Sequence, residues 1–405
     1  MLTFRIAFRS IFRQKRRSLL TALTMVGGFV LASFSIAFME GTYNHVINQF
    51  TRNSLGHIQI HHGDYTERPS LYKTIDEYRE VGDAVGSTPG VIAWAPRIYS
   101  GGLSSLGDKS AGARIIGIDP QKEEAATGFT KKLRQGHTFS ETAAHEAILG
   151  QGLADILSAR LGDSIVVLSQ GADGSLANDM YEMVGTVETG NQMDDISSFY
   201  LHLADAQELL VLSGQVHEIA IICEELDELG MVAADIRSGL ENDSLSVETW
   251  HQFARQFYQA MMADKQSSWI PLTIIIIVVA IGVLNTVLMT VMERRREYGL
   301  LRAVGTGPAQ VFGLVLLETG FLALMSIAVA TVISLIANHT MSIHGLTLGE
   351  TISYGGMDFS TYYTELNLRS FWLPGLSVFG SALLVAIFPA LKAAHTKPAR
   401  TMRMH

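Results

Sequence analysis

The side chains most able to do chemistry are concentrated in "MERRREYGLLRAVG", the stretch from Met292 to Gly305. Its charged residues are Glu293, Arg294, Arg295, Arg296, Glu297 and Arg302. This stretch directly follows an uncharged run that begins at Gln266. Arginine forks make paired, charge-assisted hydrogen bonds with carboxylates, and arginines that only set membrane orientation would not need acids among them. The pattern therefore indicates a charged binding surface at the end of an apolar segment.

Other patterns that resemble catalytic or metal sites are incomplete. His57, His61 and His62 have no acid or cysteine beside them at ligand spacing. The alternation in "GHIQIHHG" already explains His57 and His61 as the polar face of a strand. The segment Gly102–Leu106 lacks the last glycine of a Gly-x-Ser-x-Gly elbow, and no Gly-x4-Gly-Lys-Ser/Thr loop occurs. We expect no catalytic residue, no metal site and no cofactor within this chain.

Composition separates an acidic central block from basic, apolar ends. Only 17% of the 405 residues are charged, against about 25% in soluble proteins, and the mean hydropathy is +0.23. Residues 41–268 carry 15 basic and 32 acidic side chains, whereas the rest carries 15 and 7. The basic residues border apolar runs, so they indicate membrane orientation and not nucleic-acid binding. Cys223 is the only cysteine, which excludes an intramolecular disulfide.

Four stretches are long enough to cross a bilayer, which takes about 20 apolar residues. The predicted spans are residues 18–40, 269–292, 311–337 and 371–391. The β-branched run Thr273–Val279 would suit a buried strand, but its length and flanks favour a helix. A cleaved signal peptide is the alternative for the first span, but its apolar region should be shorter, about 7–15 residues. We therefore expect an uncleaved anchor and a multi-pass protein in the lipid bilayer.

Positive residues set the predicted orientation. Basic residues without acids precede the first span, and four arginines follow the second. The loop 338–370 holds Arg369 against three acids. By the positive-inside rule both termini and the connection 293–310 are cytoplasmic, and the tail is 392–405. Residues 1–17 are predicted to form a basic amphipathic helix on the inner leaflet.

The external block, residues 41–268, alternates strand and helix patterns, which predicts an α+β domain. A helix is expected over Thr74–Val85, and an Asp-Gly turn at Asp173 joins two strands. The order of predicted helices and strands changes near Pro120. We therefore predict one domain from 41–118 and 213–260, with a second inserted at 119–212. The fold class is therefore a membrane protein with four transmembrane α-helices and a large α+β periplasmic domain with an inserted subdomain.

Two polar groups stand inside the predicted spans. Asn285 lies three residues after Gly282, and the first span offers the small residues Gly27 and Gly28. Small residues let helices approach closely, so Asn285 either bonds within its own bundle or contacts another subunit. Glu318 is costly in hydrocarbon and marks a functional site by default. Near the basic boundary its carboxylate can reach lipid headgroups or an arginine, so we expect it to anchor the third span, with Arg302 or Arg294 as possible partners.

Several motifs together resemble one family. "NTVLMTVMERRREYGLLRAVGTGPAQVFGLVLLE", the opening "IAFRSIFRQKRRSLLTAL" and the closing "FPALKAAHTKPARTMR" are similar to the permease family of MacB, LolC/LolE and FtsX, the type VII ABC transporters. The likeness covers all four spans and their order around the outer domain. Tyr298 departs from the family, which more often has Ile at that position.

The resemblance implies a bacterial inner-membrane dimer, of this permease with an identical or related one, bound to two ABC-type ATPase subunits that hold ATP and Mg. Force from the ATPases would reach the outer domain through the spans, and the external halves would be porter-like and inserted subdomains. The implied coupling residues are Glu293, Arg294, Glu297, Tyr298, Leu301 and Arg302. "GHIQIH" favours the lipoprotein-release branch, with a periplasmic carrier or adaptor as partner. Tripartite efflux of small molecules or peptides, and an FtsX-like activator of periplasmic enzymes, remain alternatives.

Overall fold

The computed structural model describes residues 15–240, 242–267, 269–354 and 357–396. The chain divides into two compact units, which are described separately below. The helical unit comprises Met1–His45, Met262–Leu348 and Thr361–His405. The α/β unit comprises Val46–Met261 and Gly349–Ser360. Most of the predicted amphipathic helix 1–17 and much of the tail 392–405 lie outside the described residues.

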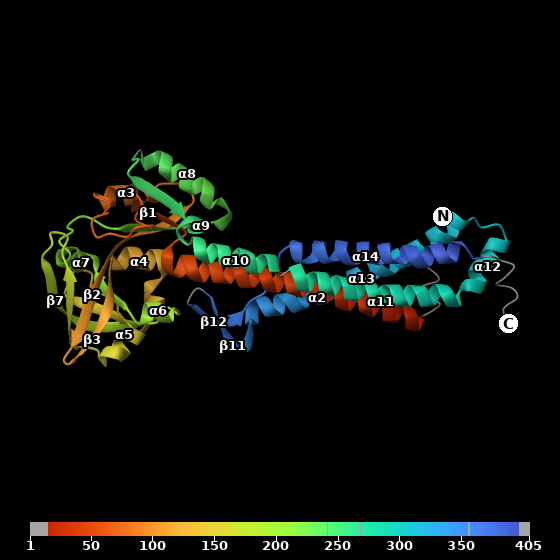
Figure 1. Ribbon diagram of the computed structural model, residues 1–405, viewed down its shortest axis with the longest axis horizontal. Coiled ribbons are helices and arrows are strands. Elements are labelled where there is room, and N and C mark those ends of the chain that lie inside the picture. Colours follow the sequence, from red (N-terminus) through yellow and green to blue (C-terminus); the bar gives the residue numbers. More distant parts are fainter. Residues whose placement is uncertain (1–14, 241, 268, 355–356, 397–405) are drawn as a thin grey trace. The chain divides into compact units, whose positions relative to one another are not determined.

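Among the residues that the structure describes, four helices are long and apolar enough to cross a membrane, as predicted. The spans and the helices next to them are α2 Lys15–Phe50, α10 Arg255–Ser267, α11 Trp269–Glu293, α12 Arg295–Ala303, α13 Pro308–His344 and α14 Arg369–Ala394 (Figure 1). The β-branched run Thr273–Val279 lies within α11. An apolar run of that length buries its polar backbone in lipid only as a helix, so the strand alternative is wrong.

The core of the helical unit is lined by small and β-branched residues. On α11 the buried positions Val279, Val283, Val287 and Val291 recur every four residues and form one face. They pack with Met25 and Phe29 of α2 and with the alanines of α14. The buried alanines are Ala382, Ala386, Ala390 and Ala393. Small side chains on α14 let it pack closely against both α11 and α13.

Glycines set the contact between α2 and α11. A Cβ added at Gly28 would lie 1.9 Å from Cγ2 of Val279, and one at Gly282 would lie 2.6 Å from Cγ2 of Thr24. These two positions therefore have no room for a side chain. Gly27 differs, because a Cβ there would have no atom within 4 Å. Close helix packing was predicted for Gly27, Gly28 and Gly282. The structure has it at Gly28 and Gly282, and it places Gly27 on the open face.

The third apolar helix runs past the predicted end of its span. α13 continues to His344, and a hairpin of β11 Leu346–Tyr354 and β12 Met357–Tyr362 follows in the region predicted as a loop. Asn338 is fully buried, and its Nδ2 donates to Oγ of Ser33, 3.3 Å away. The Thr364 hydroxyl donates to the Asn338 carbonyl at 2.7 Å. These bonds pair the Asn338 side-chain amide nitrogen and backbone carbonyl, in a region that the hydropathy pattern assigns to a loop.

The α/β unit is built on a ten-stranded sheet. Its order is β10-β1-β9-β2-β3-β8-β5-β7-β4, and β6 pairs with both β2 and β7. The strands are β1 Ile58–His62, β2 Val91–Leu106, β3 Lys109–Ile118, β4 Leu133–Gly136, β5 Glu146–Gly150, β6 Ser164–Gln170, β7 Leu176–Val187, β8 Ser198–His202, β9 Glu218–Cys223 and β10 Leu245–Thr249.

Ten short helical segments complete this unit, some of them visible around the sheet in Figure 1. They are η1 Thr51–Leu55, α3 Tyr78–Gly86, α4 Pro120–Thr127, η2 Phe129–Lys132, α5 Gln151–Leu157, α6 Gln192–Asp195, α7 Leu203–Leu209, η3 Leu226–Glu228, α8 Leu229–Leu240 and α9 Trp250–Phe253. The helix predicted from Thr74 begins only at Tyr78, because Glu77 before it has the left-handed φ of 50°.

The sheet continues across the predicted border between the two external parts. β3, before the border, pairs in parallel with β8 through Arg114 and Ser198. The predicted Asp-Gly turn joins β6 to β7, with Asp173 Oδ1 accepting from the Ser175 amide at 2.9 Å. The division into 41–118 with 213–260 and an insertion at 119–212 stays a prediction, with the sheet shared between the parts.

The polar face of β1 is buried. His57, Gln59 and His61 are each less than 5% exposed. His57 Nδ1 accepts the Cys223 amide at 3.0 Å, which requires the neutral ring at this atom. Burial, assisted by the charge of Arg52, lowers the pKa of His57 to about 4. Sequence periodicity identified the polar face, and tertiary packing decides that it lies inside.

We expect the α/β unit to lose stability as the pH falls from 6.5 toward 4. In this pH range His57 is protonated in the unfolded chain but stays neutral in the folded chain. The free energy of unfolding therefore falls by about 3 kcal/mol between pH 6.5 and 4. Urea unfolding of the full chain, followed by tryptophan fluorescence, measures the loss. A His57→Gln variant keeps an acceptor for Cys223 and should show a shallower pH dependence. An identical pH dependence in both proteins would contradict this assignment.

Candidate functional site

The charged stretch folds as a short helix between two turns. α12 begins at Arg295 directly after α11, and it ends at Ala303. Gly305 has a φ of 100°, which favours glycine. Pro308 is the first residue of α13, and the Gly307 amide donates to Oε1 of Gln310 at 3.1 Å. The sequence itself predicts a turn at Gly305–Pro308, because proline and two glycines stop a helix there, and the structure has this turn between α12 and α13.

Arg294 connects α12 to α13. Its Nη1 donates to both carboxylate oxygens of Glu318, at 3.0 and 2.9 Å, and its Nε donates to Glu297 at 2.9 Å. The Arg294 side chain is 11% exposed and that of Glu318 20%. The guanidinium carbon also lies 5.4 Å from the centroid of the Tyr298 ring. Of the two arginines expected to pair with Glu318, Arg294 makes the contact.

Tyr298 and Leu301 face the interior of the helical unit. Tyr298 is 1% exposed and packs with the apolar core that includes Val291 and Val311, and Leu301 packs against the same core. Because these two side chains point inward, they hold α12 in place and are not available for contact with another protein. Arg302 also bonds locally, because its Nη1 donates to the Thr306 carbonyl at 3.2 Å.

The outward face of α12 is formed by residues that the sequence pattern did not select. Arg295 and Arg296 are exposed, and so are Leu300 at 57% and Val304 at 86%. Leu300 and Val304 are four residues apart, a spacing that places them on one helix face. That spacing was available in the sequence, but it competed with the equally helical pair Tyr298 and Leu301. Glu293 is exposed at the end of α11, and Glu297 is partly exposed.

Asn285 lies on the outside of its own helical unit. Its side chain is exposed, and so is Gly27 on α2. An exposed amide inside an apolar span is costly unless another helix or a polar surface satisfies it. Of the two alternatives for Asn285, this position favours a contact with another subunit.

Within the described residues, no group of three or more His, Cys, Asp or Glu could hold a metal ion.

Comparisons with known proteins agree along the whole chain. The MacB-like periplasmic core domain matches residues 18–238, and the FtsX-like permease C-terminal domain matches residues 269–398. The lipoprotein-releasing system transmembrane protein LolC of Neisseria meningitidis is 22% identical over 412 residues, 98% of each chain. The macrolide export ATP-binding/permease protein MacB of Campylobacter jejuni is 24% identical over 98% of this chain and 60% of its own length.

Among solved structures, the periplasmic region of MacB from Actinobacillus actinomycetemcomitans matches 52% of this chain and 95% of its own, at 14% identity and a TM-score of 0.39. The periplasmic core match covers more than half of this chain, and the permease match covers α11 to α14. The chain therefore belongs to the inner-membrane ABC transporter permeases of the LolC/LolE/MacB type.

Proposed function

We propose that this permease receives force from separate ATPase subunits on α12 and transmits it to its periplasmic domain, so as to release lipoproteins or other amphiphiles from the membrane. The observation that carries the proposal is the two-sided character of α12. Arg294 and Tyr298 fix its inner face to the helical unit, while Arg295 and Leu300 stand exposed on its outer face. A rigid element with a charged and apolar outer face suits a protein partner.

ATP and Mg belong to the partner in this account. A P-loop supplies backbone amides and a lysine for nucleotide phosphates, and no such motif occurs in these 405 residues. Two ATPase subunits would then serve two permeases, with both termini of each permease in the cytoplasm. The exposed Asn285 supports a second permease beside α2 and α11, since its side-chain amide would otherwise be unsatisfied in lipid. The exposed Gly27 on α2 leaves room for such a helix to approach closely.

Lipoprotein release is the preferred cargo function because the likeness to LolC extends over nearly all of both chains. A periplasmic carrier would then receive the cargo. Export of a small molecule through a tripartite system is the second candidate, and the likeness to a macrolide exporter supports it. Co-purification separates the two, because the first requires a lipoprotein and a carrier, and the second an adaptor with an outer-membrane channel.

Charge reversal on α12 tests the coupling. Arg295→Glu with Arg296→Glu should weaken ATPase binding about tenfold or more, because two charges would turn repulsive at the interface. Insertion should not change, because the tail and the first-span flank keep their basic residues. The matched control is Lys392→Glu, an exposed basic residue on α14. Co-purification of the ATPase measures the effect, and retention at the control level in the double variant would contradict the proposed interface.

A further inference from the structure

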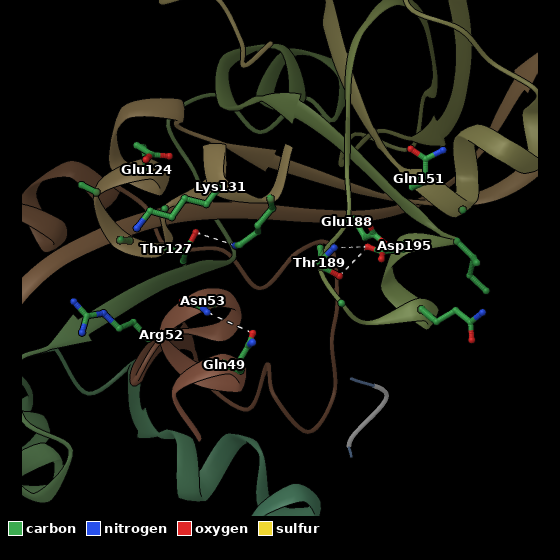
Figure 2. A pocket seen from close by; sticks show the side chains of 18 residues that line it. Gln49, Arg52, Asn53, Glu124, Thr127, Lys131, Gln151, Glu188, Thr189 and Asp195 are labelled. Atoms are coloured by element: carbon green, nitrogen blue, oxygen red, sulfur yellow. Dashed lines mark hydrogen bonds between the residues drawn. The ribbon is translucent and has the colours of Figure 1, made fainter. Parts of the chain in front are cut away.

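A polar cavity of about 910 Å³ lies inside the α/β unit. Figure 2 shows its lining side chains, which come from four separate parts of the chain, one of them the segment from Glu188 to Ile196. Gln49, Arg52 and Asn53 come from the end of α2 and from η1, Glu124 and Lys131 from the α4–η2 segment, and Gln151 from α5. No part of the proposed coupling mechanism uses this cavity, so its lining requires a separate explanation.

The carboxylates around the cavity already have hydrogen-bond donors. Glu124 accepts the Thr130 amide at 2.8 Å, and Glu188 pairs with Arg134. Asp195 accepts both the amide and the hydroxyl of Thr189, at 2.9 and 2.8 Å (Figure 2). Each of these acids is therefore engaged by the protein itself.

Two cations at the cavity differ from these acids. Arg52 and Lys131 are exposed, and within the described residues neither side chain has a hydrogen bond or an ion pair. Lys132 beside them is partly buried, and its Nζ donates to the Thr127 hydroxyl at 3.2 Å. The cavity therefore offers positive charge that is available to a ligand, beside carboxylates that already accept hydrogen bonds from the protein.

Amide side chains form most of the remaining polar lining. Gln49 and Asn53 lie 3.5 Å apart at their amide groups. The Oε1 atom of Gln151 is buried without a partner, while its Nε2 donates to Asp155 at 2.9 Å. An amide group has both a donor and an acceptor, which is the pattern of a peptide unit. This oxygen is shielded from the cavity, so amides such as those of Gln49 and Asn53 are the ones that a peptide could contact.

We propose that this cavity binds a short, extended polypeptide segment that carries carboxylate side chains. Arg52 and Lys131 would hold the carboxylates, and the amide side chains would bond the peptide groups between them. A phosphate headgroup fits less well, because it concentrates its negative charge near the lining carboxylates of Glu124, Glu188 and Asp195. Only the origin of the peptide rests on the proposed function: the peptide would be the polypeptide part of the cargo.

The test uses the full chain in lipid nanodiscs and a fluorescent nonapeptide of Gly, Ser and Asp. Matched peptides carry Asn or Lys in place of Asp. The Asp peptide should bind about tenfold more tightly than the Asn peptide, and Arg52→Gln with Lys131→Gln should remove that difference. The control is Arg68→Gln with Arg160→Gln, two exposed arginines that do not line the cavity, and it should bind like the unaltered protein.

A gain of binding distinguishes the site from misfolding. Arg52→Glu with Lys131→Glu should reverse the preference and bind the Lys peptide more tightly than the Asp peptide. Equal binding of all three peptides, or displacement of the Asp peptide by millimolar glycerol 3-phosphate, would overturn the proposal, the latter in favour of a lipid headgroup.

The cargo assay separates this proposal from the proposed function. Peptide binding that survives the charge changes would overturn the site even if lipoprotein co-purifies with the complex. Charge-dependent peptide binding without any lipoprotein in the complex would support the site, and it would count against the proposed cargo.

Discussion

Gly28→Val is expected to lower the stability of the helical unit by about 1–3 kcal/mol, the usual range for overpacking a full interior. The new Cβ would lie 1.9 Å from Cγ2 of Val279, a side chain that is only 3% exposed. Neither helix can yield without moving its neighbours, so α2 and α11 must separate. Loss of the folded protein on heating in detergent solution measures the effect.

Gly27→Val is the matched control for this prediction. It introduces the same side chain one residue earlier on the same helix, where a Cβ meets no atom within 4 Å. Its effect on the single chain should stay near the helix-propensity difference, well under 1 kcal/mol. Val279→Ala should restore part of the stability of Gly28→Val, because it removes the methyl groups that clash. Equal losses for Gly27→Val and Gly28→Val would show that α2 and α11 do not meet at Gly28.

Glu318→Leu is expected to destabilise the helical unit by about 2–3 kcal/mol and to uncouple ATP hydrolysis from transport. Removing one partner of a buried ion pair leaves the other charge uncompensated, and Arg294 would keep only the partly exposed Glu297. Because Arg294 also contacts the Tyr298 ring, α12 would lose its attachment to α13. Thermal unfolding and cargo release per ATP hydrolysed measure the two effects.

The double variant Arg294→Met with Glu318→Leu separates stability from coupling. Replacing both charges with apolar side chains removes the uncompensated charge, so the stability should recover to about that of the unaltered protein. Coupling should stay low, because the connection from α13 through Arg294 to Glu297 is absent. Full coupling in the stable double variant would show that the ion pair serves stability alone.

The elements that depend on local patterns could be predicted from the sequence. Span lengths follow from hydropathy, and α11 is a helix despite its β-branched run because lipid demands internal hydrogen bonds. The turn before Pro308 and the Asp-Gly turn at Asp173 follow from the backbone preferences of proline and glycine. These features need no knowledge of distant contacts, which is why the sequence predicts them.

The features that depend on distant contacts could not be predicted in the same way. Helical spacing placed Tyr298 and Arg294 on α12, but it could not say which face the core covers. Glu318 had two possible arginine partners, and only the packing of α12 selects Arg294. The burial of His57 depends on β9 and β10 pairing on either side of β1. The cavity brings four chain segments together, and no local motif marks such a meeting point.

If ATP hydrolysis in the partner subunits moves the periplasmic domain through α12, a distance measurement detects the movement most directly. Spin labels at Asp173→Cys and His344→Cys, both exposed, would be placed in a Cys223→Ala background in the reconstituted complex. Trapping with ATP and vanadate should shift the distance distribution, and Arg295→Glu with Arg296→Glu should abolish the shift. An unchanged distribution in a complex that hydrolyses ATP and releases cargo would contradict this mechanism.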